Sequence, residues 1–121
     1  MEGSMIQEAL EEYKAGVSAL EKHLPQVARE YNRFTQACFK KGELSVKQKH
    51  LIGIALGCLT NDEFCIIYHT KEAVDQGAKQ QEVLEAAAVA GAFGGGMAMS
   101  QTVTLLQEAL QEFTGGESTV H

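Results

Sequence analysis

Long apolar runs, tryptophan and a disulfide-type cysteine pattern are all missing from this chain of 121 residues, which also has only one proline. No stretch approaches 18 consecutive apolar residues, so we expect neither a transmembrane helix nor a membrane partner. Three cysteines at irregular spacing, without a signal segment at the start, make no disulfide framework and favour the reducing cytoplasm. The single proline leaves long stretches free to form helices.

Positive charge is also scarce, since 10 Lys and Arg face 16 Asp and Glu and the formal net charge is −6. This balance argues against nucleic acid or an anionic membrane surface as the main partner, because both repel an acidic chain. Apolar residues make up 45% of the chain and predict a modest core for one domain over residues 5–114. We set residues 1–4 aside as a cloning remnant and interpret residues 115–121 as a frayed tail.

Apolar residues recur at spacings of three and four along most of the sequence, which is the period of an amphipathic helix. Capping-box patterns at Ser45–Gln48 and Thr60–Glu63 predict two helix starts, whereas Gly77 and Gly94–Gly96 predict helix ends. No β-type alternation competes, so we predict an all-α domain of about six helices. These helices cover approximately residues 6–24, 25–38, 46–59, 61–77, 83–93 and 99–113.

Small and apolar helix faces predict self-association. The run Ala86–Ala92 allows close approach of another helix, and the first predicted helix carries a long apolar stripe. A chain of this size has little interior in which to bury so much apolar surface, so we expect a homo-oligomer. A tightly packed monomer core is the alternative.

The segment Asn61–His69 has the most chemical content, because it places a thiol and an imidazole one helical turn apart. Cys65 and His69 share a helix face at i and i+4, and Asp62 falls on the same stripe. His69 could take the proton of Cys65 and give a thiolate–imidazolium pair. The positive end of the helix favours the thiolate, whereas the charge of Asp62 opposes it. The sequence leaves open which influence prevails.

A second imidazole extends this candidate site. His50 lies in the middle of the preceding predicted helix, from where an antiparallel hairpin could bring it to the Cys65 region. One cysteine and two histidines could hold a metal ion, but none of the zinc-ligand spacings is present. Gly94–Gly96 follows a helix and lacks the Lys-Ser/Thr of a phosphate loop. We therefore expect neither a metal nor a cofactor, and the alternative for Cys65 and His69 is a structural role.

Four segments together resemble the carboxymuconolactone decarboxylase superfamily and, within it, the alkylhydroperoxidase-D-like branch. They are Lys47–Ile52, Cys65–Lys71, Gly77–Ala78 and Phe93–Gly96, and the resemblance covers about residues 40–113. It implies a compact, alkylhydroperoxidase-D-like helical fold that assembles into trimers or hexamers. It also implies peroxide or thiol–disulfide chemistry at a Cys-x-x-Cys-x-x-x-His motif, with a glutamate on the preceding helix as proton relay.

The match to that motif is partial. By the resemblance, Cys65 takes the place of the second cysteine and His69 takes that of the histidine. Asp62 stands at the first cysteine, and His50 stands at the relay glutamate. A two-cysteine peroxidase needs a second thiol to resolve the oxidised sulfur as a disulfide, which Asp62 cannot do. Cys58, seven residues before Cys65, is the other candidate for that part.

We therefore interpret the chain as a weak, thiol-dependent antioxidant or redox protein. Cys65 would be the nucleophile and His69 its base, with His50 and Asp62 as polar partners. Its small-molecule partners would be a peroxide and an external thiol reductant. Two alternatives stay open. One is a decarboxylase-like enzyme that uses His50, His69 and Asp62 on a small carboxylated lactone, and the other is a non-enzymatic assembly protein that keeps the fold.

Overall fold

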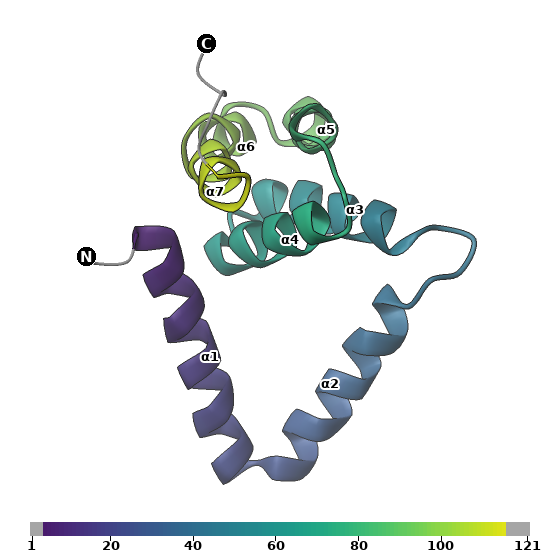
Figure 1. Ribbon diagram of the computed structural model, residues 1–121, viewed down its shortest axis with the longest axis vertical. Coiled ribbons are helices and arrows are strands. Elements are labelled where there is room, and N and C mark those ends of the chain that lie inside the picture. Colours follow the sequence, from purple (N-terminus) through teal and green to yellow (C-terminus); the bar gives the residue numbers. More distant parts are fainter. Residues whose placement is uncertain (1–3, 116–121) are drawn as a thin grey trace.

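Helices are the only regular elements of residues 4–115, the part of the chain that the computed structural model describes (Figure 1). They are α1 (Met5–His23), α2 (Pro25–Phe39), α3 (Val46–Thr60), α4 (Glu63–Asp75), α5 (Gln80–Gly94), α6 (Gly96–Gln101), the π-helical turn η1 (Thr102–Leu106) and α7 (Gln107–Phe113). The last three run on as one rod, because both junctions keep right-handed helical backbone angles. Counting that rod once, the all-α prediction with about six helices is confirmed.

Several helix boundaries follow directly from sequence signals. At α3 the predicted capping box is present: the Ser45 hydroxyl accepts from the N–H of Gln48, whose side chain accepts from the N–H of Ser45. Pro25 is the first residue of α2, where its missing N–H leaves no helical bond unmade. Gly77 and Gly95 follow α4 and α5 at φ values of 90° and 65°, which glycine adopts without strain.

The start of α4 differs from the prediction. Thr60 is the last residue of α3, and its hydroxyl donates to a carbonyl one turn earlier in the same helix. Asn61 turns the chain with a left-handed φ of 62°, and the carboxylate of Asp62 accepts from the N–H of Cys65. The predicted capping box at this turn is therefore wrong. A threonine within a helix bonds back along that helix, and the following aspartate, a strong N-cap residue, takes the cap position.

The predicted domain, residues 5–114, lies within the described part of the chain, which begins at Ser4 and ends at Gly115. Ser4, which we set aside with residues 1–3, is the N-cap of α1, and its hydroxyl accepts from the N–H of Gln7 at 3.0 Å. α7 ends at Phe113, two residues before Gly115 with its φ of 91°. The remainder of the predicted remnant and tail, residues 1–3 and 116–121, lies outside the described residues.

The main core lies between α3, α4, α5 and the last rod. Its buried members are Ile54, Cys58, Ile66, Ala73, Ala78, Val83, Ala87, Ala90, Ala98, Leu106 and Leu110. Five of these side chains are alanines, two of them from the run predicted to allow close helix approach. Small side chains bring helix axes near one another, and these alanines lie on α4, α5 and α6 and in the turn between α4 and α5.

α1 and α2 form a V whose apex points away from this core (Figure 1). Only Ile6, Leu10 and Ala28 are buried in the two helices. The apolar stripe that the sequence predicts is present but exposed, with relative exposures of 45–64%. Its exposed members are Tyr13, Leu20, Leu24, Val27, Tyr31 and Phe34. The periodicity thus predicted the faces correctly, while the described part of the chain leaves most of them uncovered.

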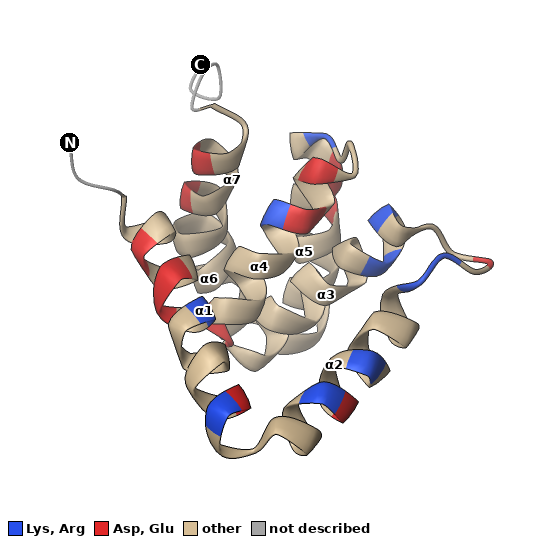
Figure 2. Ribbon diagram, turned by 60° about the horizontal axis from the view of Figure 1, so that its bottom comes forward, with Lys and Arg blue, Asp and Glu red and all other residues tan. Residues whose placement is uncertain are grey.

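Charged residues are distributed over several elements rather than gathered in one field. Figure 2 shows acidic residues on α1, α5 and α7, and basic residues on α2 and near the start of α3. Among the described helices, none has both the length and the hydropathy that crossing a bilayer requires.

Candidate functional site

Two glycines on α3 lie against the two candidate site residues of α4, Cys65 and His69. A Cβ added at Gly53 would lie 2.7 Å from the imidazole of His69, and one added at Gly57 would lie 3.1 Å from the backbone nitrogen of Ile66 and 3.3 Å from the Cβ of Cys65. The glycines are one turn apart on α3, as Cys65 and His69 are on α4. The antiparallel hairpin therefore presents both predicted residues on the face of α4 that packs against α3, with no room for a larger residue at Gly53.

His50 and His69 form a hydrogen-bonded imidazole pair. Their Nδ1 atoms lie 2.9 Å apart, and His50 is almost fully buried at 5% exposure. Burial, followed by the charge of His50, lowers the pKa of His69 to about 4, and burial lowers the pKa of His50 as well. Both rings are therefore neutral at pH 7. One Nδ1–H must donate to the other Nδ1, so the donor ring has an unprotonated Nε2 that can act as a base.

Aromatic rings enclose this pair. Phe39, the last residue of α2, stacks on His50 and His69 with ring centroids 4.6 and 5.1 Å apart. Tyr68 meets the same two imidazoles edge-on. Sequence reasoning missed Phe39, since it lies off the predicted apolar stripe of its helix and reaches the site only where α2 returns to α3. Tyr68 could have been found from its position within the Cys–His segment.

Cys65 is a half-buried, protonated thiol at neutral pH. Burial, which is the largest cause, the hydrogen bond to Asp62 and the negative charge of that carboxylate together raise its pKa to about 11. The positive end of α4 favours the thiolate, but its effect on the pKa of Cys65 is smaller than that of burial and Asp62. Asp62 also accepts from the N–H of Cys65 at 3.1 Å. Within residues 4–115 no hydrogen bond joins the thiol of Cys65 to either imidazole of the pair, so direct proton transfer from Cys65 to His69 needs a small rearrangement or a water.

Cys58 belongs to the core rather than to the site. It is 1% exposed, and the hydroxyl of Thr102 in η1 donates to its sulfur at 3.9 Å. Burial raises the pKa of this thiol. All three cysteines of the chain, Cys38, Cys58 and Cys65, are free. Because its thiol is buried and its pKa is raised, Cys58 is a poor candidate for the resolving thiol.

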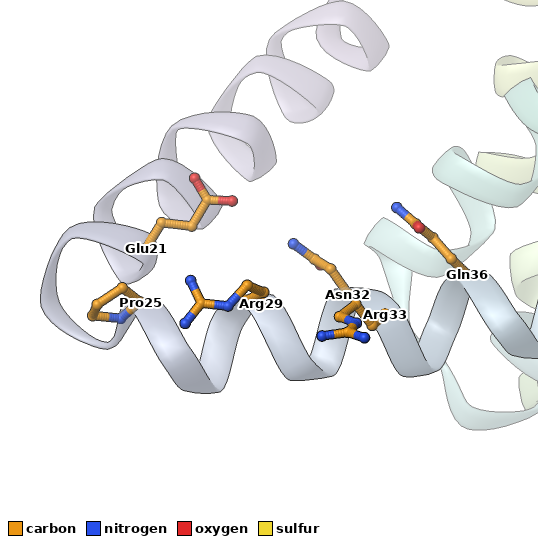
Figure 3. Close-up of a pocket in the computed structure, with 6 residues that line it drawn as sticks. All are labelled: Glu21, Pro25, Arg29, Asn32, Arg33 and Gln36. Atoms are coloured by element: carbon orange, nitrogen blue, oxygen red, sulfur yellow. The ribbon is translucent and has the colours of Figure 1, made fainter.

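A pocket elsewhere in the structure contains none of these residues. It has a volume of about 430 Å³ and lies in the angle between α1 and α2 (Figure 3). Its lining consists of Glu21, Pro25, Arg29, Asn32, Arg33 and Gln36, all of them exposed. In the part of the chain that is described, no three His, Cys, Asp or Glu side chains are arranged to hold a metal ion.

Residues 25–108 match the profile of the carboxymuconolactone decarboxylase family. Two solved structures with this fold come from that family. One, from Legionella pneumophila, is 27% identical with a TM-score of 0.87, and the match covers 93% of this chain and 99% of that chain. The other, from Thermotoga maritima, is 24% identical with a TM-score of 0.74, and the match covers 92% of this chain and 97% of that chain. No curated protein sequence is significantly similar to this chain.

Proposed function

The chain belongs to the carboxymuconolactone decarboxylase family, and from that premise we propose that it is a slow, thiol-dependent antioxidant protein that reduces peroxides at Cys65. One observation carries the proposal: the partly exposed thiol of Cys65 and the imidazole of His69 sit one turn apart on one face of α4, against matching glycines of α3. A part in an antioxidative response has been suggested for the Thermotoga maritima relative, which supports an antioxidant function for this chain.

The chemistry begins with loss of the thiol proton of Cys65 to solvent, with the His50–His69 pair passing the proton on rather than keeping it, since the pKa of His69 is about 4. The thiolate of Cys65 attacks the outer oxygen of the peroxide, so that an S–O bond forms while the O–O bond breaks. Sulfur is oxidised to sulfenic acid, and the peroxide is reduced to an alcohol or to water. Two molecules of an external thiol then restore Cys65 and leave as a disulfide, with release of water.

Two features make this reaction slow. A pKa of about 11 leaves only a small fraction of Cys65 as thiolate at pH 7. Asp62, at the position of the resolving cysteine in the family motif, cannot form a disulfide with the sulfenic acid. An external thiol is therefore required in each cycle, and a cytoplasmic location would provide one.

The experiment is peroxide consumption in the presence of a panel of small thiols, with Cys65→Ser compared with Cys38→Ser. Cys38 is exposed and free but outside the site, so it is a matched control for loss of a thiol. We expect Cys65→Ser to abolish the thiol-dependent consumption and Cys38→Ser to retain it. Equal activity of both variants and the wild type would contradict the proposal.

A second function is favoured by the neutral imidazole pair. His50 and His69 could move protons in a decarboxylase-like reaction on a small carboxylated lactone, without any thiol. Binding the carboxylates would need cations, yet Lys49 donates to two backbone carbonyls and Lys71 pairs with Asp75. For this reason we rank it below the redox function. Lactone turnover that survives Cys65→Ser would favour it, and inactivity in both assays would favour a non-enzymatic assembly protein.

The exposed stripe of the α1–α2 hairpin supports a homo-oligomer. Six large apolar residues are 45–64% exposed there, although the sequence places them on continuous helix faces. A second copy of the chain would bury them, because each subunit carries the same apolar stripe and the two stripes can pack against each other. A trimer or hexamer, which the family resemblance implies, would satisfy this requirement.

A further inference from the structure

The side chain of Lys49 on α3 binds the C-terminal end of α2. Its Nζ donates to the backbone carbonyl of Cys38 at 2.9 Å and to that of Lys40 at 2.6 Å. A Cβ added at Gly42 would lie 4.0 Å from the same nitrogen, so the turn after α2 passes around the ammonium group. The last carbonyls of a helix have no partner within it, and a lysine that bonds to them stabilises the helix end. Lys49 therefore fixes where α2 ends relative to α3.

Phe39 lies in the chain between the two residues whose carbonyls Lys49 binds. Its ring stacks on the imidazoles of His50 and His69, with centroid distances of 4.6 and 5.1 Å and interplanar angles of 21° and 19°. Lys49 also immediately precedes His50 in α3. The hydrogen bonds of Lys49 and the stacking of Phe39 thus act on the same short segment, residues 38–40, and hold it against the imidazole pair.

α2 has few other attachments that could hold Phe39 in place. The only buried side chain of this helix is Ala28, which lies about three helical turns before Phe39. Within residues 4–115 the ammonium group of Lys49 forms no ion pair, so no carboxylate competes for the hydrogen bonds that it donates to α2. The position of the Phe39 ring therefore depends on the hydrogen bonds of Lys49 and on the stacking itself.

The cover matters because the imidazole pair is neutral through burial. Burial is the largest cause that lowers the pKa of both imidazoles, and the charge of His50 lowers that of His69 further. The charges of Glu72 and Asp62 act in the opposite direction, on His50 and His69 respectively. Since Phe39 covers a face of each ring, its departure would admit water, and hydration favours the charged form of an imidazole.

Resting on the proposed function, in which the imidazole pair passes on the proton of Cys65, we infer that Lys49 is a positioning residue that holds Phe39 over the pair and keeps water from it. Lys49 forms no hydrogen bond with either imidazole in the described part of the chain, so it acts through the end of α2. When its two hydrogen bonds are lost, the end of α2 can move away and both rings become accessible.

The test measures how fast diethyl pyrocarbonate acylates each histidine, because the reagent attacks neutral imidazoles and mass spectrometry assigns the product to a residue. In the wild type His50 and His69 should react slowly, and the rate at His69 should change less than about twofold between pH 8 and pH 5. In Lys49→Met both should react at least about tenfold faster at pH 8, as for loss of hydrogen bonds to a charged group. The rate should then fall at least about threefold towards pH 5, because a hydrated imidazole becomes protonated in this range.

Two further variants test whether Lys49 acts through Phe39. Phe39→Ala removes the cover directly, and the double variant with Lys49→Met should react no faster than Phe39→Ala alone. Lys47→Met is the matched control, since Lys47 belongs to the same helix but pairs with Glu82, and it should react as the wild type does. His23, which is exposed on α1, should keep the same rate in every variant.

The histidine rates decide the role of Lys49 without any reaction of Cys65. Wild-type rates in Lys49→Met, or a further acceleration in the double variant, would overturn the inference. An acceleration in Lys47→Met as large as that in Lys49→Met would indicate a general loosening of α3 and would overturn it as well. A wild-type chain that forms no sulfenic acid at Cys65 after peroxide treatment would instead overturn the proposed function alone.

Discussion

Gly53 on α3 lies directly against the imidazole of His69, and a single added carbon there would come within 2.7 Å of the ring. Contacts this short are not tolerated, so the imidazole of His69 or the backbone of α3 would have to shift. The position of the His69 imidazole thus depends on the absence of a side chain at Gly53.

We expect Gly53→Ala to destabilise the protein by about 1–3 kcal/mol, because overpacking a closely packed helix pair forces side chains from their preferred positions. Gly16→Ala is the matched control, since Gly16 is also within a helix but has no atom within 4 Å of an added Cβ. There the change should stabilise by roughly 0.5–1 kcal/mol, through the higher helix propensity of alanine. Urea unfolding measures both, and equal effects at the two positions would contradict the packing argument.

The imidazole pair should make the stability depend on pH. His69 has a pKa of about 4 in the folded protein, compared with about 6.5 in an unfolded chain, so the unfolded state binds more protons between these values. Its contribution to the free energy of unfolding is complete above about pH 6.5 and is lost as the pH falls towards 4. The loss should amount to no more than about 3 kcal/mol.

His69→Asn should flatten that dependence. In this variant the difference in unfolding free energy between pH 7 and pH 4 should be smaller than in the wild type, because the depressed imidazole is gone. His23→Asn, at an exposed position near the end of α1, controls for the loss of a histidine outside the site. Unfolding followed by circular dichroism at several pH values provides the comparison, and an unchanged slope in His69→Asn would count against a buried neutral pair.

The carboxylate of Asp62 should hold back the reactivity of Cys65. Asparagine caps a helix as well as aspartate does, so Asp62→Asn keeps the bond to the backbone of Cys65 but removes the charge. The pKa of the thiol should fall from about 11, though burial, its largest cause, keeps it above the ordinary value. We expect iodoacetamide to react roughly three- to tenfold faster at pH 8. Glu63→Gln, in the same first turn, should leave the rate unchanged.

Replacing Asp62 by cysteine should supply the missing resolving thiol. Asp62→Cys restores a Cys-x-x-Cys pair across the first turn of α4, and after peroxide treatment it should form an internal disulfide that a dithiol reductant can recycle. Asp62→Ser is the control, because serine keeps a capping oxygen without a thiol. Mass spectrometry identifies the product. In the wild type we expect sulfenic acid or a mixed disulfide at Cys65, and a dominant Cys58–Cys65 disulfide would show that Cys58 resolves after all.

The exposed hairpin should self-associate. Light scattering at micromolar concentration should give three or six times the chain mass of 13.1 kDa. Phe34→Glu places a charge on the exposed apolar stripe and should reduce that mass, whereas Gln36→Glu adds the same charge to the same helix outside the stripe and should not. A stable monomer of the wild-type chain would refute the prediction.

Local features of the sequence were sufficient to determine the helices and much of the motif. The periodicity and the Ser45 capping box predicted where helices lie, because both depend on residues within one or two turns of each other. The i, i+4 spacing of Cys65 and His69 likewise determined that they share a face. The prediction that Thr60 caps α4 was wrong because its hydroxyl can either accept from an N–H three residues ahead or donate to the Leu56 carbonyl one turn back. The sequence alone does not decide between these two bonds.

Only the tertiary structure decided what surrounds those residues. The contact of His50 with His69, the stacking of Phe39 on both rings and the arrival of Tyr13 at Phe64 join elements far apart in the chain. The state of Cys65 was also undecided in the sequence, since the helix end and Asp62 act in opposite directions. Burial settles it in favour of the protonated thiol, and burial is a property of packing that no local spacing specifies.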